Sequence, residues 1–81
     1  MSDAGAGPAL TRQWRASPRP AERAAARIAA ELAGRQRWDP VDGTVDLAAR
    51  LDLPAGTVRA AKVLLAGNGV IMKSAGRYWV A

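Results

Sequence analysis

The fold of this chain is decided by residues 44–69, TVDLAARLDLPAGTVRAAKVLLAGNG. Leu47 and Leu51 lie four residues apart and give a helix over about 44–51 a single apolar side. The same spacing predicts a second helix over about 55–67. Its apolar stripe consists of three residues at helical intervals: Val58, Ala61 and Leu65. Each helix therefore has one side to bury and one side to expose.

The two predicted helices are joined by Asp52, Leu53 and Pro54, a connection that leaves room only for a sharp corner. Asp52 tolerates a left-handed backbone, and Pro54 prevents the first helix from continuing. Leu53 is expected to fill the angle between the helices. Two helices that cross at such a corner form a helix-turn-helix, whose second helix usually enters the major groove of DNA.

An earlier helix is predicted to begin near Ser17, which can cap it, and to end at Gly34. Its buried face consists of five apolar residues at helical spacing: Ala21, Ala24, Ala25, Ile28 and Leu32. Arg27 is expected to pair with Glu31 four residues on. Arg23 has no such partner, so a contact with a DNA phosphate is a hypothesis for it. Trp38, in the loop that follows, is expected to cover the core.

Residues 1–16 contain Gly, Ala, Pro and Ser without a sustained period, and we expect them to form a disordered basic arm. Arg12, Trp14 and Arg15 place an aromatic ring among positive charges within this arm. The arm could lie on phosphates or in a minor groove of DNA. The alternative is a solvated tail in which the tryptophan has no binding role.

The last residues change from a helical period to an alternating one. Val70-Ile71-Met72 and Tyr78-Trp79-Val80 are strand-forming triplets, and the loop between them contains Gly76, which predicts a β-hairpin. A helix-turn-helix followed at once by a hairpin is a winged helix. We therefore expect a mainly α fold with a small β part over residues 17–81, made of three helices and a C-terminal β-hairpin wing. Lys73 and Arg77 would sit at the tip or shoulders of this wing, either to contact DNA or as solvated charges that protect a sheet edge.

Four short motifs occur in an order that resembles the winged-helix domain of GntR-type bacterial repressors. They are Leu47-Ala48-Ala49-Arg50-Leu51, Gly56-Thr57-Val58-Arg59, Leu64-Leu65 and Gly69-Val70-Ile71. The likeness covers about residues 20–81 and implies a three-helix winged fold that binds operator DNA. It also implies that Thr57 and Arg59 contact DNA and that Gly76 lies in the wing.

The chain departs from this family at several positions. Val41, Asp42, Gly43 and Val45 stand where the family usually opens its second helix with a Leu-Pro-Ser cap and an early arginine. Lys62 stands where a core leucine is usual, and Val63 where a polar residue is usual. We expect no effector-binding or dimerisation domain to follow, and therefore no small-molecule sensor.

The exposed arc of the helix over about 55–67 would carry the residues that read DNA. The planar guanidinium of Arg59 matches the two acceptors of guanine in the major groove. Thr57 could donate to a phosphate or a base, and Ala60 and Val63 could meet thymine methyl groups. The stem of Lys62 is expected to pack while its amine reaches out. Phosphate contacts are expected from four basic residues: Arg23, Lys62, Lys73 and Arg77.

The charge balance supports a polyanionic partner. The chain has 12 Lys and Arg against 7 Asp and Glu, a formal net charge of +5, and no acidic residue follows Asp52. The function expected is sequence-specific binding of double-stranded DNA by a small bacterial transcriptional regulator, in the cytoplasm and associated with the nucleoid. The alternative is a winged-helix adaptor that binds a protein partner or acts as a DNA-binding accessory factor. A homodimer or a protein partner would add the affinity that one small module lacks.

Other classes of function are disfavoured by the residue inventory. The chain contains no cysteine and no histidine, so the usual catalytic bases, thiol nucleophiles and nitrogen or sulfur metal ligands are missing. We therefore expect no enzyme activity, no cofactor and no metal site. No apolar run approaches the roughly 18 residues that a membrane-spanning helix needs.

Overall fold

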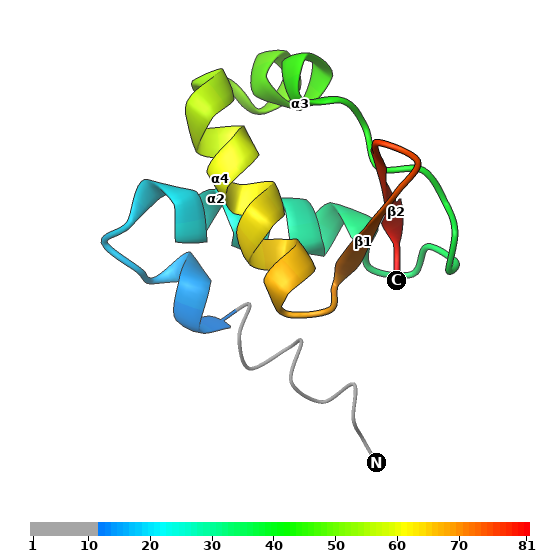
Figure 1. Ribbon diagram of the computed structural model, residues 1–81. Helices are drawn as coiled ribbons and strands as arrows, with labels where there is room; N and C mark the ends of the chain where they lie inside the picture. The colour runs from blue at the N-terminus through cyan, green and yellow to red at the C-terminus, as the bar shows by residue number, and fades with distance from the viewer. Residues whose placement is uncertain (1–11) are drawn as a thin grey trace.

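A helical turn, three longer helices and a β-hairpin follow one another along residues 12–81, the part of the chain that the computed structural model describes (Figure 1). Residues 12–15 form the helical turn. The longer elements, in chain order, are α2 (Pro20–Leu32), α3 (Thr44–Leu51), α4 (Ala55–Gly67), β1 (Ile71–Ser74) and β2 (Arg77–Val80). The predicted mixture of helices with a small antiparallel sheet is confirmed.

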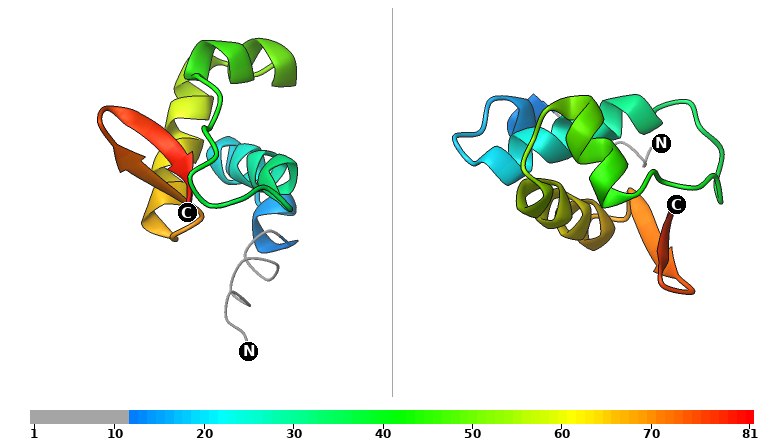
Figure 2. Two further views of the ribbon diagram at one scale, coloured as in Figure 1. Left: turned by 90° about the vertical axis from the view of Figure 1, so that its right-hand side faces the viewer. Right: turned by 90° about the horizontal axis from the view of Figure 1, so that it is seen from above.

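The helices and the hairpin are arranged around α4. It crosses α2, which lies behind it, and α3 sits over the end at which α4 begins (Figure 1). The hairpin projects from the same side of the molecule as α4, the side away from α2 (Figure 2). Five large side chains between these elements are almost fully buried: Ile28, Leu47, Val58, Leu65 and Ile71. The core is therefore formed where α2, α3, α4 and β1 meet.

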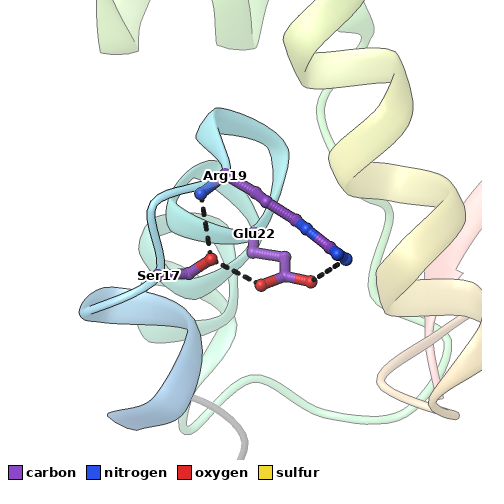
Figure 3. A network of polar contacts seen from close by, with 3 residues as sticks. All are labelled: Ser17, Arg19 and Glu22. Carbon is purple, nitrogen blue, oxygen red and sulfur yellow. Dashed lines mark hydrogen bonds and ion pairs between the residues drawn. The ribbon is translucent and has the colours of Figure 1, made fainter.

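The helix α2 begins three residues later than predicted. Ser17 and Arg19 each precede a proline, and such residues are disfavoured in the helical region. Arg19 accordingly takes an extended conformation at the N-cap, and Pro20 opens the helix. The Ser17 hydroxyl accepts a hydrogen bond from the Arg19 backbone at 3.0 Å and donates one to the Glu22 carboxylate (Figure 3). Ser17 thus orders the turn before the helix instead of capping the helix itself.

The corner between α3 and α4 has the predicted geometry. Asp52 lies in the left-handed region at φ 57° and ψ 52°, and its N–H donates to the last carbonyls of α3. Leu53 is half-buried against the core, and Pro54 occupies the N-cap of α4 with φ −61°. Because the left-handed residue reverses the chain and the proline cannot extend α3, the two helices end and begin where the sequence predicted.

Most of the predicted disordered arm, residues 1–11, lies outside the described residues. The last part of the predicted arm is ordered: residues 12–15 are helical, and Trp14 is buried in the core with only 7% of its surface exposed. A buried indole removes a large apolar surface from water, which is sufficient reason for this turn to dock. The folded part of the chain therefore begins before Ser17, and the predicted boundary was too late.

The hairpin is longer than predicted and turns more tightly. Its register pairs Ile71 with Val80 at the open end and Ser74 with Arg77 next to the turn. The two turn residues, Ala75 and Gly76, have φ of +54° and +76°. Two consecutive positive φ values define a type I′ turn, whose twist matches that of the strands.

The loop between α2 and α3 runs beside β2. The N–H of Val80 donates to Asp39 O at 2.8 Å, and the N–H of Val41 donates to Tyr78 O at 3.1 Å. Trp38 is 55% exposed and meets Trp79 edge to face, with ring centroids 6.1 Å apart. The expectation that Trp38 covers the core was therefore wrong, because the loop lies on the sheet edge instead of over the helices.

The type I′ turn predicts a stabilising substitution. Ala75→Asn should raise the free energy of unfolding by about 1 kcal/mol, because asparagine tolerates the left-handed region better than alanine. Thermal unfolding followed by circular dichroism should show a midpoint about 4–8 °C higher. Ala75→Ser, which adds a polar group without this preference, should change the midpoint little. An unchanged or lower midpoint for Ala75→Asn would contradict the turn geometry.

Candidate nucleic-acid interface

The predicted reading face of α4 points outward. Val58, Ala61 and Leu65 are fully buried, as their spacing predicted. Arg59 and Ala60 are exposed, Val63 is 63% exposed, and Thr57 is half-buried. We call these four exposed or half-exposed residues the α4 face: Thr57, Arg59, Ala60 and Val63.

Arg59 is the one charged group on this face. Its guanidinium takes part in none of the hydrogen bonds or ion pairs found among residues 12–81, and α4 contains no acidic residue. Its neighbours on the exposed arc are small, since Gly56 precedes it by three residues and Ala60 follows it. Because these neighbours are small, the backbone of α4 can approach a binding partner closely, and the longer Arg59 side chain can extend beyond the helix towards that partner.

The basic residues of the hairpin flank its turn. Lys73 and Arg77 are both exposed, one on each strand. The Lys73 ammonium lies 5.6 Å from the ring centroid of Tyr78, and the Lys62 ammonium lies at the same distance from that ring. Contacts of this length are weak cation–π interactions that orient the amines without neutralising them.

Three of the predicted basic residues meet in one pocket. It has a volume of about 390 Å³ and lies between the hairpin, α4 and the start of α3. Its basic lining residues are Lys62, Lys73 and Arg77, and Gly43 and Thr44 bring the first turn of α3 to it. The three basic side chains give the pocket its positive charge, while Asp46 in the first turn of α3 already places a carboxylate at the start of that helix.

Lys62 is placed differently from the sequence prediction. It is only 5% exposed, and its ammonium donates to Asp42 O at 2.7 Å and approaches the Thr44 hydroxyl at 3.4 Å. Burial lowers the pKa of Lys62 from its ordinary value, and the negative charge of Asp42 partly opposes this shift. The stem packs as expected, but the amine turns towards the 42–44 segment instead of reaching out. Lys62 thus connects this segment to α4 by hydrogen bonds, and it contributes one of the basic side chains that line the pocket.

Arg23 is not brought to this part of the molecule. It lies on α2, where its guanidinium donates to Ser17 O at 2.8 Å, and it lines a different pocket together with Arg15 and Arg27. The expected phosphate contact of Arg23 would therefore be separate from those of the hairpin.

Ala60 and Val63 also take part in a second feature. With Leu64 they line an apolar hollow of about 450 Å³ between α4 and the start of α2. Its other lining residues are Arg19, Ala21 and Glu22. The sequence predicted the exposure of Ala60 and Val63 but not this hollow, which depends on how closely α2 approaches α4.

Arg50 pairs with two carboxylates that come from outside its own helix. Arg50 lies 2.8 Å from the Asp42 carboxylate and 2.9 Å from that of Glu31. One guanidinium thus serves both carboxylates, and Asp39 and Asp46 take part in no ion pair among residues 12–81.

Among the described residues, no group of three or more potential metal ligands occurs. None of the helices within residues 12–81 is both long and apolar enough to span a bilayer. Comparison of the chain with protein-family models, with curated proteins and with solved structures finds no match.

Proposed function

We propose that this protein is a winged helix-turn-helix protein that binds double-stranded DNA. In this proposal α4 enters the major groove, and the hairpin rests on the backbone or in the adjacent minor groove. The observation that carries it is the exposed guanidinium of Arg59 on α4, which no ion pair among residues 12–81 compensates. The hairpin, whose turn is flanked by Lys73 and Arg77, projects from the same side of the molecule as α4 (Figure 2). The proposed role in the cell is that of a small transcriptional regulator.

The order of the elements supports the winged-helix assignment. A helix, a segment lying along the hairpin, a second helix, a sharp corner, a third helix and the hairpin follow one another. The same order underlies the resemblance to GntR-type repressors, in which Thr57 and Arg59 would touch DNA. The remaining contacts proposed for the α4 face are apolar ones from Ala60 and Val63 to thymine methyl groups.

The dimensions of α4 suit a groove. Its 13 residues give a length of about 20 Å at 1.5 Å per residue, and the major groove is about 12 Å wide. A single module of this size covers roughly 600–1,000 Å² of its own surface on DNA. Useful affinity therefore calls for a second copy, a tandem site or a partner protein.

The hairpin contribution can be measured by the salt dependence of binding. Each phosphate contact releases counterions, and losing one reduces the slope of log K against log salt by about 0.9. Lys73→Ala combined with Arg77→Ala should therefore reduce the slope by about two units if both touch phosphates. Binding to a duplex selected from random sequences, measured by fluorescence anisotropy at several salt concentrations, gives this slope.

The matched control for this measurement is Arg35→Ala combined with Arg37→Ala. It removes the same charge from two exposed residues that belong neither to the α4 face nor to the pocket at the hairpin, and it should leave the slope nearly unchanged. If both double variants reduce the slope equally, only the overall charge of the protein matters. If the Lys73 and Arg77 double variant leaves the slope unchanged, the hairpin does not contact DNA phosphates.

The exposure of Val63 favours a second candidate function, that of an adaptor which binds a protein partner through α4. Val63, Ala60 and Leu64 offer an apolar hollow, and apolar side chains at the centre of a patch are typical of protein interfaces. If α4 binds protein and not DNA, no duplex should be enriched from random sequences at low salt.

A further inference from the structure

Three arginines gather at the end of the molecule opposite the hairpin. Arg15 belongs to the helical turn before α2, and Arg23 and Arg27 lie one turn apart on α2. They line a pocket of about 220 Å³ together with Pro20, Ala24 and Leu53. The start of α2 and the α3–α4 corner lie side by side at this end, and the hairpin lies at the other (Figures 1 and 2). We call this feature the arginine pocket.

Two of its guanidinium groups are held in place by backbone carbonyls. Arg23 donates to Ser17 O at 2.8 Å, and Arg27 donates to Leu51 O at 3.2 Å. A carbonyl orients a guanidinium but does not cancel its charge. Both side chains are therefore fixed in direction while their remaining N–H groups stay free to donate.

No carboxylate compensates this charge among residues 12–81. The sequence predicted an ion pair between Arg27 and Glu31, but Glu31 pairs with Arg50 at 2.9 Å instead. Glu22 pairs with Arg19 at 3.4 Å and also accepts from Ser17. Three like charges thus share one small pocket, an arrangement that an incoming anion would stabilise.

The chemistry of the pocket indicates the kind of anion. Guanidinium forks bind carboxylates with two parallel hydrogen bonds. The floor between them consists of carbon, supplied by Pro20, Ala24 and the half-buried Leu53. A ligand that fills this pocket therefore needs an apolar group on the floor and negative charges at the rim.

We propose that the arginine pocket binds an acidic segment of a partner protein. An apolar side chain of that segment rests on Pro20, Ala24 and Leu53, and neighbouring carboxylates accept hydrogen bonds from the three arginines. A DNA backbone fits less well, because it offers phosphates in a continuous row and no apolar side chain for the floor. The pocket would leave the hairpin side free, so the protein could hold a partner at one end and another ligand at the other. The proposal does not require that the other ligand is DNA.

The experiment uses the full chain and two short fluorescein-labelled peptides. One peptide has two leucines flanked by aspartate and glutamate, and the matched control peptide has asparagine and glutamine in their places. Binding is measured by fluorescence anisotropy. The acidic peptide should bind at least about tenfold more tightly than the amide peptide, because a carboxylate brings a full negative charge and two acceptor oxygens to each guanidinium fork, whereas an amide brings one neutral acceptor.

Variants of the protein locate the binding. Arg15→Gln combined with Arg23→Gln should weaken binding of the acidic peptide at least about tenfold, whereas Arg35→Gln combined with Arg37→Gln should leave it unchanged. Arg23→Lys keeps the positive charge but loses the forked guanidinium. Its affinity for the acidic peptide should therefore lie between the affinities of the pocket variant and the control variant. Circular dichroism shows whether each variant is folded. If the double variant does not fold, the Arg15→Gln single variant replaces it in the binding measurement, because Arg15 makes none of the carbonyl contacts described above.

Three outcomes overturn the proposal. The first is equal binding of the two peptides, or no binding of the acidic one. The second is an equal effect of the pocket and control variants. The third is a loss of duplex DNA affinity in the pocket variant, with peptide binding intact, which would assign these arginines to phosphates. Failure of DNA binding in the unmodified protein, by contrast, bears only on the α4 face and the hairpin.

Discussion

Arg59→Ala is expected to weaken binding of the selected duplex by about 5- to 150-fold and to flatten the preference at one base pair. The range corresponds to the 1–3 kcal/mol of discrimination that a bidentate contact with guanine provides. The fold should be unaffected, since the Arg59 side chain is exposed and forms none of the hydrogen bonds or ion pairs among residues 12–81. Fluorescence anisotropy with a panel of duplexes, each changed at one base pair, measures both effects.

Two further variants separate the charge of Arg59 from its shape. Arg59→Lys retains the charge and should keep part of the affinity, but it should lose most of the preference at that base pair because an ammonium cannot form the fork. Arg35→Ala removes an exposed charge elsewhere and should change neither quantity much. If Arg59→Ala leaves affinity and preference intact, α4 does not read the duplex.

Lys62→Ala is expected to lower the free energy of unfolding by about 2–5 kcal/mol, the range for truncating a large buried side chain to alanine. The loss has two sources. The stem packs in the core, and the ammonium donates to Asp42 O and approaches the Thr44 hydroxyl, so the 42–44 segment loses its attachment to α4. Urea unfolding followed by circular dichroism measures the change. A variant as stable as the unmodified protein would contradict the buried position of this lysine.

Lys62→Met keeps most of the stem and removes only the amine, so it isolates the cost of burying charge. Burial lowers the pKa of Lys62 in the folded state below its ordinary value of 10.5, which the unfolded chain retains. Between these two values the unfolded state binds more protons, so the contribution of Lys62 to stability rises as the pH increases through this window. The unmodified protein should therefore gain stability relative to Lys62→Met as the pH rises towards 10.5. A difference that stays constant or shrinks with rising pH would contradict the cause of the shift.

The α3–α4 unit was predictable because its determinants are local. The apolar stripes of both helices depend only on residue spacing, and the corner depends on Asp52 accepting a left-handed backbone directly before Leu53-Pro54. Turn chemistry of this kind is set by a few adjacent residues. For the same reason the sequence predicted which side of α4 is exposed, and Arg59 lies there.

The tryptophans could not be assigned in this way. Trp14 was expected in a disordered arm and is buried, whereas Trp38 was expected over the core and is 55% exposed. Each outcome depends on the path of a segment that has no periodic pattern of its own. The turn at residues 12–15 docks on the core, and the loop before α3 follows the edge of β2.

The charged residues show the same limit. Helical spacing favoured a pair between Arg27 and Glu31, but Arg50 approaches Glu31 from α3 and takes its place. Lys62 was expected to direct its amine outward, but the loop before α3 brings a carbonyl to it. Contacts between elements that are distant in the sequence decided both cases, and a pattern read along one helix contains no information about them.

The most direct test of the proposed DNA binding is selection of sites by the full chain from a pool of random duplexes, followed by titration of the enriched duplex at two salt concentrations. The proposal predicts enrichment of a short motif that contains guanine, with an affinity that falls steeply as salt increases. It also predicts that Arg59→Ala enriches the same motif without the preference for that guanine. Failure to enrich any motif, with no measurable binding at low salt, would contradict the claim that α4 and the hairpin form a DNA-binding surface.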